Sequence, residues 1–312
     1  MADTQHDNYI AGEWRSGADT IDNRNPSEPS DSLGRFAQAD GAQTREAIAA
    51  ARSAQPEWAR TGLESRYNAL LAIGSELMER ADELGRELSR EEGKPFAEGK
   101  GEVYRAGQFF HYYAAEVHRQ IGDVADSVRP GIEVSVQREP VGVVGVISPW
   151  NFPLATAVWK IAPALAFGNA VVWKPANLVP ASAWHFAEIL SRQNLPAGVF
   201  NLVMGRGGEV GDALIGSPDV DAISFTGSVE TRGGDDIITS IFEDDEGKLW
   251  IRSSAKLVLV ESQTTIRYSG CETPVTFQNN KCGGLMAQEN GPKHPDHWKW
   301  DLSWKLDENP NR

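Results

Sequence analysis

The residues best suited to chemistry lie near the middle of the chain, where two apolar runs each end in a polar side chain. One run ends at Ile147 and is followed by Ser148-Pro149-Trp150-Asn151-Phe152, and a second run ends at Lys174. An amide held at the end of a buried strand can donate a hydrogen bond to an oxygen that gains negative charge in a transition state. Asn151 is therefore a candidate oxyanion donor, although capping the following helix is an equally good use of this residue type.

Lys174 and the segment Thr226-Gly227-Ser228 are candidates for binding a nucleotide. A lysine at a strand end can bond ribose hydroxyls or a phosphate as a point charge, whereas taken alone it is more simply a surface residue. Gly227 would let the backbone approach a diphosphate, and free N–H groups at a helix start favour an anion. An ordinary turn in which Ser228 caps a helix is the simpler explanation of that segment. The glycines at 205, 207 and 211 match the dinucleotide fingerprint only loosely.

These residues belong to a pattern of strands alternating with helices. The segment 41–118 has helical periodicity, with a break at Gly93-Lys94-Pro95, and a half-exposed strand follows at 132–137. Apolar strands are expected at 141–147, 170–173, 199–204 and 221–225, with helices near 153–167 and 180–192. This alternation predicts an α/β fold with a parallel sheet and helices on both faces. Ligands of such sheets bind beyond the carboxyl ends of the strands, where Asn151 and Lys174 lie.

Composition narrows the partners of the chain. The 312 residues carry a formal net charge of −14, which argues against nucleic acid and anionic membrane surfaces. The most apolar stretch, 152–173, is interrupted by Lys160, Pro163 and Gly168, so we expect a helix and a buried strand there and no membrane span. The N-terminus has no secretory pattern and the chain has only two cysteines, which predicts a cytoplasmic location.

The motifs, taken in order, resemble the N-terminal half of the aldehyde dehydrogenase superfamily over residues 8–231. The segments that carry the resemblance are Gly93-Lys94-Pro95, Glu139-Pro140-Val141-Gly142, Pro149-Trp150-Asn151-Phe152-Pro153, Lys174-Pro175-Ala176 and Phe225-Thr226-Gly227-Ser228. Segments 128–131 and 200–207 are most similar to the semialdehyde branch, in particular to enzymes of 2-oxoglutarate semialdehyde. The resemblance implies a Rossmann-type sheet, a homo-oligomer, and NAD- or NADP-dependent oxidation of a small aldehyde to a carboxylic acid.

The resemblance also implies a role for individual residues. Asn151 resembles the oxyanion donor of the family, and Phe152 and Trp159 resemble residues that line its aldehyde tunnel. Asn177 stands where NAD-preferring members often have Glu, so a repulsion against the 2′-phosphate of NADP is lost. The remaining expected cofactor contacts are Ile147, Ser148, Pro149, Trp150, Lys174, Gly207, Gly211, Phe225, Gly227 and Ser228.

The sequence departs from the family after about Thr231. The family continues to a Glu-Leu-Gly-Gly segment with the general base and a Gly-Gln-x-Cys segment with the nucleophile, and neither pattern occurs in this sequence. Cys282 is the nearest substitute, but its surroundings, Asn279-Asn280-Lys281-Cys282-Gly283-Gly284, do not match. The spacing of Cys271, Cys282, His294 and His297 does not fit a zinc site, and we expect no metal.

The last quarter of the chain has a different character. Residues 236–251 resemble one repeat of the β-propeller modules of two-component regulators, and 262–312 lack periodicity. We therefore expect an incomplete NAD(P)-binding region at 1–231, with an oligomerisation-type strand segment at 119–140, joined as in a chimera to an irregular, unrelated tail at 232–312. The alternatives to a catalytically incomplete dehydrogenase are a non-catalytic nucleotide-binding remnant and a chimeric sensor or interaction protein.

Overall fold

The computed structural model of the chain describes residues 4–119 and 122–227, together with the backbone of five later strands between residues 238 and 276. The chain divides into two compact units, Met1–Gln120 with Pro140–Gly234, and Ile121–Glu139 with Asp235–Arg312. The candidate site residues other than Ser228 lie in the described part of the first unit. Ser228 lies outside the described residues, as do Cys271, Cys282, His294 and His297.

A six-stranded sheet, with the strand order β11-β8-β9-β10-β2-β3, forms the centre of the first unit. The strands β11 (Ala222–Phe225), β8 (Val143–Ile147), β9 (Ala170–Lys174) and β10 (Phe200–Leu202) are parallel to one another. Two antiparallel strands, β2 (Asn8–Ile10) and β3 (Glu13–Arg15), extend the sheet beyond β10. The parallel arrangement confirms the predicted α/β fold.

Helices pack on both faces of this sheet because successive strand residues are apolar on both sides. On one face, α1 (Gly41–Arg60) and α7 (Asp212–Ile215) share a core with Val143 and Val172. On the other face, α5 (Ala155–Ala166) and α6 (Pro180–Ser191) share a core with Val144 and Val171. The neighbouring valines of one strand thus point into different cores, which explains the absence of polar alternation in the sequence.

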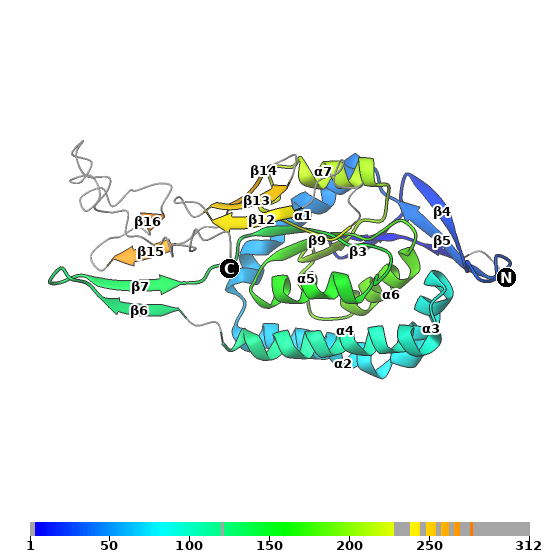
Figure 1. Cartoon of the computed structure of the whole chain (residues 1–312), viewed down its shortest axis with the longest axis horizontal. Helices are drawn as coiled ribbons and strands as arrows, with labels where there is room; N and C mark the ends of the chain where they lie inside the picture. The colour runs from blue at the N-terminus through cyan, green and yellow to red at the C-terminus, as the bar shows by residue number, and fades with distance from the viewer. Residues whose placement is uncertain are drawn as a thin grey trace, which may run out of the picture. The chain divides into compact units, whose positions relative to one another are not determined.

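Three further helices form an outer layer over α5 and α6. They are α2 (Leu63–Glu79), α3 (Ala81–Glu92) and α4 (Phe96–Val117), and α2 and α4 run side by side along the α5 side of the unit (Figure 1). The predicted break at Gly93 is confirmed, since Gly93 ends α3 with a left-handed φ of 87°. The helical segment is divided further, at Thr61 and Arg80, than its periodicity indicated.

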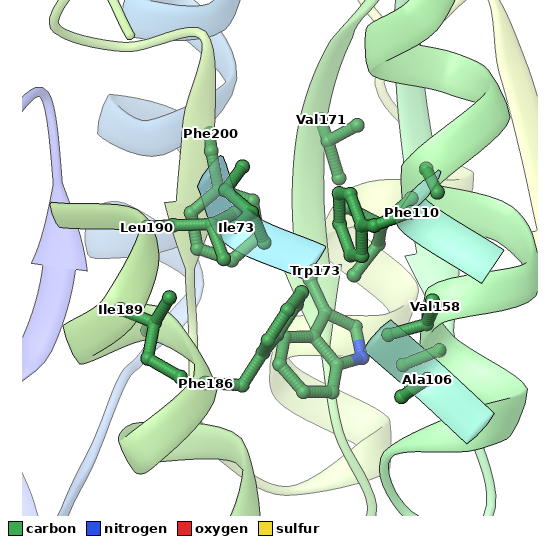
Figure 2. Close-up of a cluster of buried hydrophobic side chains, with 14 of the residues drawn as sticks. Ile73, Ala106, Phe110, Val158, Val171, Trp173, Phe186, Ile189, Leu190 and Phe200 are labelled. Carbon is green, nitrogen blue, oxygen red and sulfur yellow. The ribbon is translucent and has the colours of Figure 1, made fainter. Parts of the chain in front are cut away.

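Trp173 of β9 lies at the centre of the larger core. Figure 2 shows its indole ring against Phe186 of α6, with Phe110 of α4 and Val158 of α5 nearby. The Trp173 and Phe186 rings meet edge to face, with centroids 5.6 Å apart. The side chains of α4, α5 and α6 that surround Trp173 help to fix the position of β9 against α5. Both β9 and α5 carry candidate site residues.

The N-terminal region is more regular than the sequence indicated. The glycines and prolines of residues 8–39 predict an irregular segment with short strand-like pieces at Tyr9-Ile10 and Thr20-Ile21. In the structure, β4 (Asp19–Arg24) and β5 (Ser32–Gln38) form an antiparallel pair, and β1 (Gln5–His6) lies parallel to β5. The prolines at 26 and 29 that suggested irregularity lie in the turn between β4 and β5 rather than within a strand. Phe36 of β5 is fully buried, so tertiary packing stabilises this strand.

The described residues of the second unit form strands and the turns between them. The strands β6 (Asp123–Asp126) and β7 (Glu133–Gln137) form a hairpin. On its other side β7 pairs with β15 (Thr265–Tyr268), which in turn pairs with β16 (Val275–Thr276). A separate antiparallel sheet contains β12 (Ile238–Glu243), β13 (Lys248–Ser253) and β14 (Leu257–Glu261). Two short strands, β15 and β16, occur beyond residue 262, where the sequence showed no periodicity, and the irregular character of the remaining tail stays a prediction.

The segment 236–251, interpreted as a propeller repeat, contains the antiparallel pair of β12 and β13. A hairpin is compatible with many folds, so the propeller origin stays a prediction. No helix in the described ranges has the length and apolar character that crossing a membrane requires.

Candidate functional site

The carboxyl ends of three neighbouring parallel strands align at one edge of the sheet. Phe225 of β11 pairs with Ile147 of β8, and Ile147 pairs with Lys174 of β9. Backbone hydrogen bonds continue past the strands, since Thr226 N donates to Ile147 O at 3.0 Å and Ser148 N donates to Lys174 O at 3.3 Å. The fold thus brings together expected cofactor contacts from three separate parts of the sequence.

Lys174 is buried at this edge, with 7% of its surface exposed. Its Nζ donates to the carbonyl oxygen of Pro175 at 3.0 Å, and none of the carboxylates in the described ranges forms an ion pair with it. Burial lowers the pKa of Lys174 to about 8. The alternative that Lys174 is an ordinary surface residue is therefore wrong, and its ammonium group is available to an anion.

The segment after β8 passes from the core to the surface within a few residues. Ser148 is buried, and its Oγ accepts a hydrogen bond of 2.9 Å from Trp173 Nε1. Pro149 is half-buried, Trp150 is 52% exposed and Asn151 is exposed. The Ser148 side chain therefore holds the segment to β9, while the three residues after it face outwards where a ligand can reach them.

The N-terminus of α5 is capped by Glu102 of α4 and not by Asn151. Leu154 N and Ala155 N both donate to Glu102 Oε1 at 3.0 Å. Within the described ranges, the side-chain amide of Asn151 makes no hydrogen bond. The helix-cap alternative for Asn151 is thus wrong, and its amide is free to donate to a ligand oxygen.

Lys94 joins Glu102 to the turn that carries Asn151. Its Nζ lies 2.7 Å from Glu102 Oε2, donates to Asn151 O at 3.2 Å, and sits 4.4 Å from the ring centroid of Phe152. Burial acts to lower the pKa of Lys94, but the carboxylates of Glu102 and Glu92 outweigh it and raise the pKa above its usual value. A permanently charged lysine therefore holds both the backbone of Asn151 and the ring of Phe152.

Glu91 of α3 caps the N-terminus of α6 in the same manner. Ala181 N donates to Glu91 Oε1 at 2.6 Å, and Ser182 donates to Oε2 from both its N (2.8 Å) and its Oγ (2.5 Å). Asn23 Nδ2 donates to the same carboxylate. Burial raises the pKa of Glu91 to about 7, although these hydrogen bonds act to lower it. The helices that follow β8 and β9 therefore both begin at carboxylates of the chain itself, which disfavours a phosphate at either start.

Sequence reasoning missed these two acids, although a signal for each was present. The buried residues of α3 include Leu84 and Leu88, and Glu91 continues that stripe. The buried residues of α4 include Val103 and Ala106, and Glu102 lies on the same face. A carboxylate on an apolar stripe predicts a buried group with partners, but it does not identify the partners.

The glycines after β10 differ in their surroundings. Gly207 and Gly211 lie in η1 (Gly207–Gly211), a π-helical turn, and a Cβ added at either would have nothing within 4 Å. A Cβ at Gly205 would lie 2.5 Å from Val210 Cγ2 and 2.7 Å from the carbonyl oxygen of Ala39. Gly205 is therefore required for packing, whereas Gly207 and Gly211 leave open space beside the backbone. Gly227 is exposed and lies against the ring of Phe225.

Asn177 and the aromatic residues complete the expected set. Asn177 Oδ1 is buried and has no hydrogen-bond partner in the described part of the chain, an arrangement that a ligand hydroxyl could relieve. Phe152 and Trp159 are about half exposed, and the Trp159 ring meets Phe109 edge to face at 5.6 Å. Lys174, Asn177 and the open glycines thus fit a nucleotide, and Asn151 lies at the end of the adjacent strand.

Comparison with known proteins places residues 14–243 within a model described as the aldehyde dehydrogenase family. The alpha-ketoglutarate semialdehyde dehydrogenase of Haloferax volcanii is 39% identical over 223 residues, which are 71% of this chain and 46% of that protein. The succinate-semialdehyde dehydrogenase (NADP(+)) of Escherichia coli is 40% identical, with the same shares covered.

A solved structure agrees with these relatives. The betaine aldehyde dehydrogenase of Staphylococcus aureus, in complex with NAD+, superposes with a TM-score of 0.71 at 35% identity, covering 73% of this chain and 47% of that one. The chain thus spans about half the length of the relatives it matches. The family match extends past residue 231 to residue 243 and overlaps β12.

Proposed function

Because the chain belongs to the aldehyde dehydrogenase family, we propose that its first unit binds NAD or NADP at the edge formed by β11, β8 and β9. The observation that carries the proposal is the alignment of Phe225, Ile147 and Lys174 across three adjacent strands. A cofactor along this edge would meet the backbone of Ser148 to Trp150. It would bring the hydride acceptor of the reaction next to Asn151.

The capped helices support one orientation of the cofactor. Glu102 and Glu91 accept the backbone N–H donors at the starts of α5 and α6, so these donors are not available to the diphosphate. The backbone at Gly227, directly after β11, then remains for the diphosphate, and Gly207 and Gly211 leave open space beside the backbone that follows β10. This distribution agrees with the roles that the resemblance implies for these glycines.

The ribose end of the proposed site is compatible with NADP. Lys174 supplies a cation that no carboxylate of the described residues pairs with, and Asn177 supplies a buried acceptor without charge. A 2′-phosphate would meet the ammonium group of Lys174, and a 2′-hydroxyl could donate to Asn177 Oδ1. The E. coli relative is named as an NADP(+) enzyme, and the S. aureus structure holds NAD+.

On the substrate side, Asn151 would donate to the carbonyl oxygen of an aldehyde as that oxygen gains charge. Two of the relatives are named for semialdehydes, and we propose a semialdehyde for this chain as well. The family's nucleophile and general base have no counterpart in their usual context in this sequence. The covalent step is therefore not assigned to any described residue.

Several features stay predictions. A homo-oligomer through 119–140 and a cytoplasmic location are proposed from the resemblance and the composition. The interpretation of 236–251 as a propeller-like repeat, and of the chain as a chimera, also stays a prediction. The family match reaches residue 243 and therefore covers the first half of that segment. The main alternative function is that of a non-catalytic nucleotide-binding protein. Such a protein would use the same edge of the sheet and would not need the covalent step.

Cofactor affinity at different pH values tests the proposal. With a pKa of about 8, Lys174 is protonated below that pH and loses its charge as pH rises through it. A charge-assisted hydrogen bond to a phosphate is worth about 1.5–3 kcal/mol, so we expect NADP affinity to fall by roughly five- to tenfold from pH 7 to pH 9. NAD affinity should fall less, because NAD lacks the 2′-phosphate. Isothermal titration calorimetry measures both.

Two variants identify the group responsible. Lys174→Met should weaken NADP binding at pH 7 and remove its pH dependence. Lys160→Met is the matched control, because Lys160 is also a partly buried lysine with a lowered pKa, but it lies on α5 and donates to Thr156 O. Unchanged NADP affinity in Lys174→Met, or an equal loss in both variants, would contradict the proposed site.

A further inference from the structure

A surface beside Asn151 carries a cation that the proposed function does not use. We define the α4–α5 aromatic surface as Phe109, Phe152 and Trp159. The guanidinium carbon of Arg105 lies 5.2 Å from the ring centroid of Phe109, and the Phe109 ring in turn contacts Trp159 at 5.6 Å. Arg105 is therefore part of this surface through a cation–π contact.

The helix contacts place Arg105 close to the turn that carries Asn151. Glu102 of α4 bonds Leu154 and Ala155 at the start of α5, and Phe109, two turns later on α4, contacts Trp159, about one turn later on α5. The two helices thus run in the same direction, side by side (Figure 1). Arg105 lies about 4.5 Å along α4 from Glu102, level with the first turn of α5.

Among the described residues, three cations lie near this surface, and of these Arg105 is the one free to bind a ligand. Lys94 is held by Glu92 and Glu102 and is largely buried. Lys160 donates to Thr156 O within its own helix. Arg105 is exposed and donates to the neutral Gln108 Oε1 at 3.1 Å, and no carboxylate in the described ranges pairs with it.

We propose that Arg105 binds the carboxylate of a semialdehyde whose aldehyde group lies at Asn151. This inference rests on the proposed function. A semialdehyde of a dicarboxylic acid carries an anion at the end opposite its aldehyde, and a guanidinium group presents two parallel N–H donors that match a carboxylate. The α4–α5 aromatic surface between the two ends would cover the methylene carbons. Arg105 would then be a specificity-determining residue that distinguishes charged from neutral aldehydes.

The competing explanation is structural. Arg105 and Phe109 are four residues apart on one helix, and such a pair stabilises an exposed helix by a few tenths of a kcal/mol without any ligand. Arg86 makes the same kind of contact, with its guanidinium carbon 4.5 Å from the Phe96 ring. If Arg105 only stabilises α4, replacing it should change stability slightly and leave ligand binding unchanged.

The experiment compares two probes of the same carbon skeleton on the full chain. We chose 4-hydroxybutanoate, which has a carboxylate, and butan-1-ol, which has none, because alcohols do not react with lysines. Binding is measured by NMR from the indole N–H signal of Trp159, assigned with Trp159→Phe. We expect the wild-type chain to bind 4-hydroxybutanoate more tightly than butan-1-ol, and R105Q to weaken only the former, about tenfold. R105K should lie between them, and R86Q should match the wild type.

Each other outcome overturns the proposal. An equal effect of R105Q on both probes, no preference for the carboxylate in the wild type, or no binding of either probe would show that Arg105 is not a carboxylate site. The titrations are repeated with and without NADP. Loss of NADP binding with intact carboxylate selectivity would contradict the proposed cofactor site alone and leave the role of Arg105 in place.

Discussion

At the scale of single residues, buried carboxylates cap the N-termini of α5 and α6, a role that short polar side chains usually have. Neither α5 nor α6 has a side-chain cap from its own N-cap residue. Glu102 and Glu91 reach from the outer helices instead, which ties each inner helix to the layer above it. Because each acid accepts several hydrogen bonds, the substitution of either by Ala would leave backbone donors buried without acceptors.

The pKa of Glu91 predicts how the stability of the fold depends on pH. Its folded value of about 7 lies above the usual 4.5, so its contribution is fully present below about pH 4.5 and is lost as pH rises through 7. The free energy of unfolding should therefore fall by roughly 1–3 kcal/mol between pH 5 and pH 8. Glu91→Gln should remove this part of the pH dependence. Urea unfolding at several pH values measures it.

The exposed Glu79 of α2 offers a control for that measurement. Glu79→Gln should keep the wild-type dependence of stability on pH. If Glu91→Gln keeps it as well, the carboxylate is ionised throughout this range, and its hydrogen bonds to Ala181 and Ser182 outweigh its burial.

At the scale of elements, the turn after β10 separates glycines that pack from glycines that leave space. Gly205→Ala should lower the melting temperature by several degrees, because the added Cβ would press on Val210 and on the Ala39 backbone. Gly207→Ala should leave the melting temperature nearly unchanged, since nothing lies within 4 Å of its Cβ. If η1 lies along the cofactor, Gly207→Ala should still weaken NADP binding. Thermal unfolding and calorimetry of both variants test this, and a folded Gly207→Ala chain with full affinity would exclude η1 from the site.

The elements that could be predicted are those whose signal is local. The buried strands β8 and β9 are continuous apolar runs, and Gly93 ends a helix through its own backbone conformation. The strand β5 and the full length of β4 could not be predicted, because their stability comes from pairing across a proline-containing turn and from burial of Phe36. Strand formation there depends on tertiary contacts that no short window contains.

The candidate site divides in the same way. The positions of Asn151 and Lys174 near strand ends could be predicted because a recognisable apolar run precedes each of them, whereas their roles stay predictions. The support from Glu102 could not, because its bond to Leu154 joins positions 52 residues apart, and the bond from Glu91 to Ala181 joins positions 90 apart. The resemblance supplied roles for Phe152 and Trp159, whereas the neighbouring Arg105 gave no signal until α4 and α5 were placed side by side.

At the scale of the whole molecule, the proposed site would supply cofactor binding and an oxyanion donor, while the Glu-Leu-Gly-Gly and Gly-Gln-x-Cys patterns do not occur in the sequence. In its described residues, the first unit has a layered core, with a sheet between two helical faces, and Lys174 ends the buried strand β9. The chain spans about half the length of its relatives. Binding and turnover can therefore be tested separately on this chain.

We predict that the purified chain binds NADP but does not oxidise semialdehydes at rates typical of an enzyme. An oxyanion donor stabilises charge only after a nucleophile has attacked, so Asn151 alone has no step to accelerate. Catalytic groups that act as a unit lose most of their effect when one is absent. For Cys282 to substitute, its sulfur would have to reach within about 3–3.5 Å of the aldehyde carbon. The measurement is NADPH formation from succinate semialdehyde, followed by absorbance, in wild-type and Cys282→Ser chains. Turnover that Cys282→Ser abolishes would prove this prediction wrong and would identify Cys282 as the nucleophile.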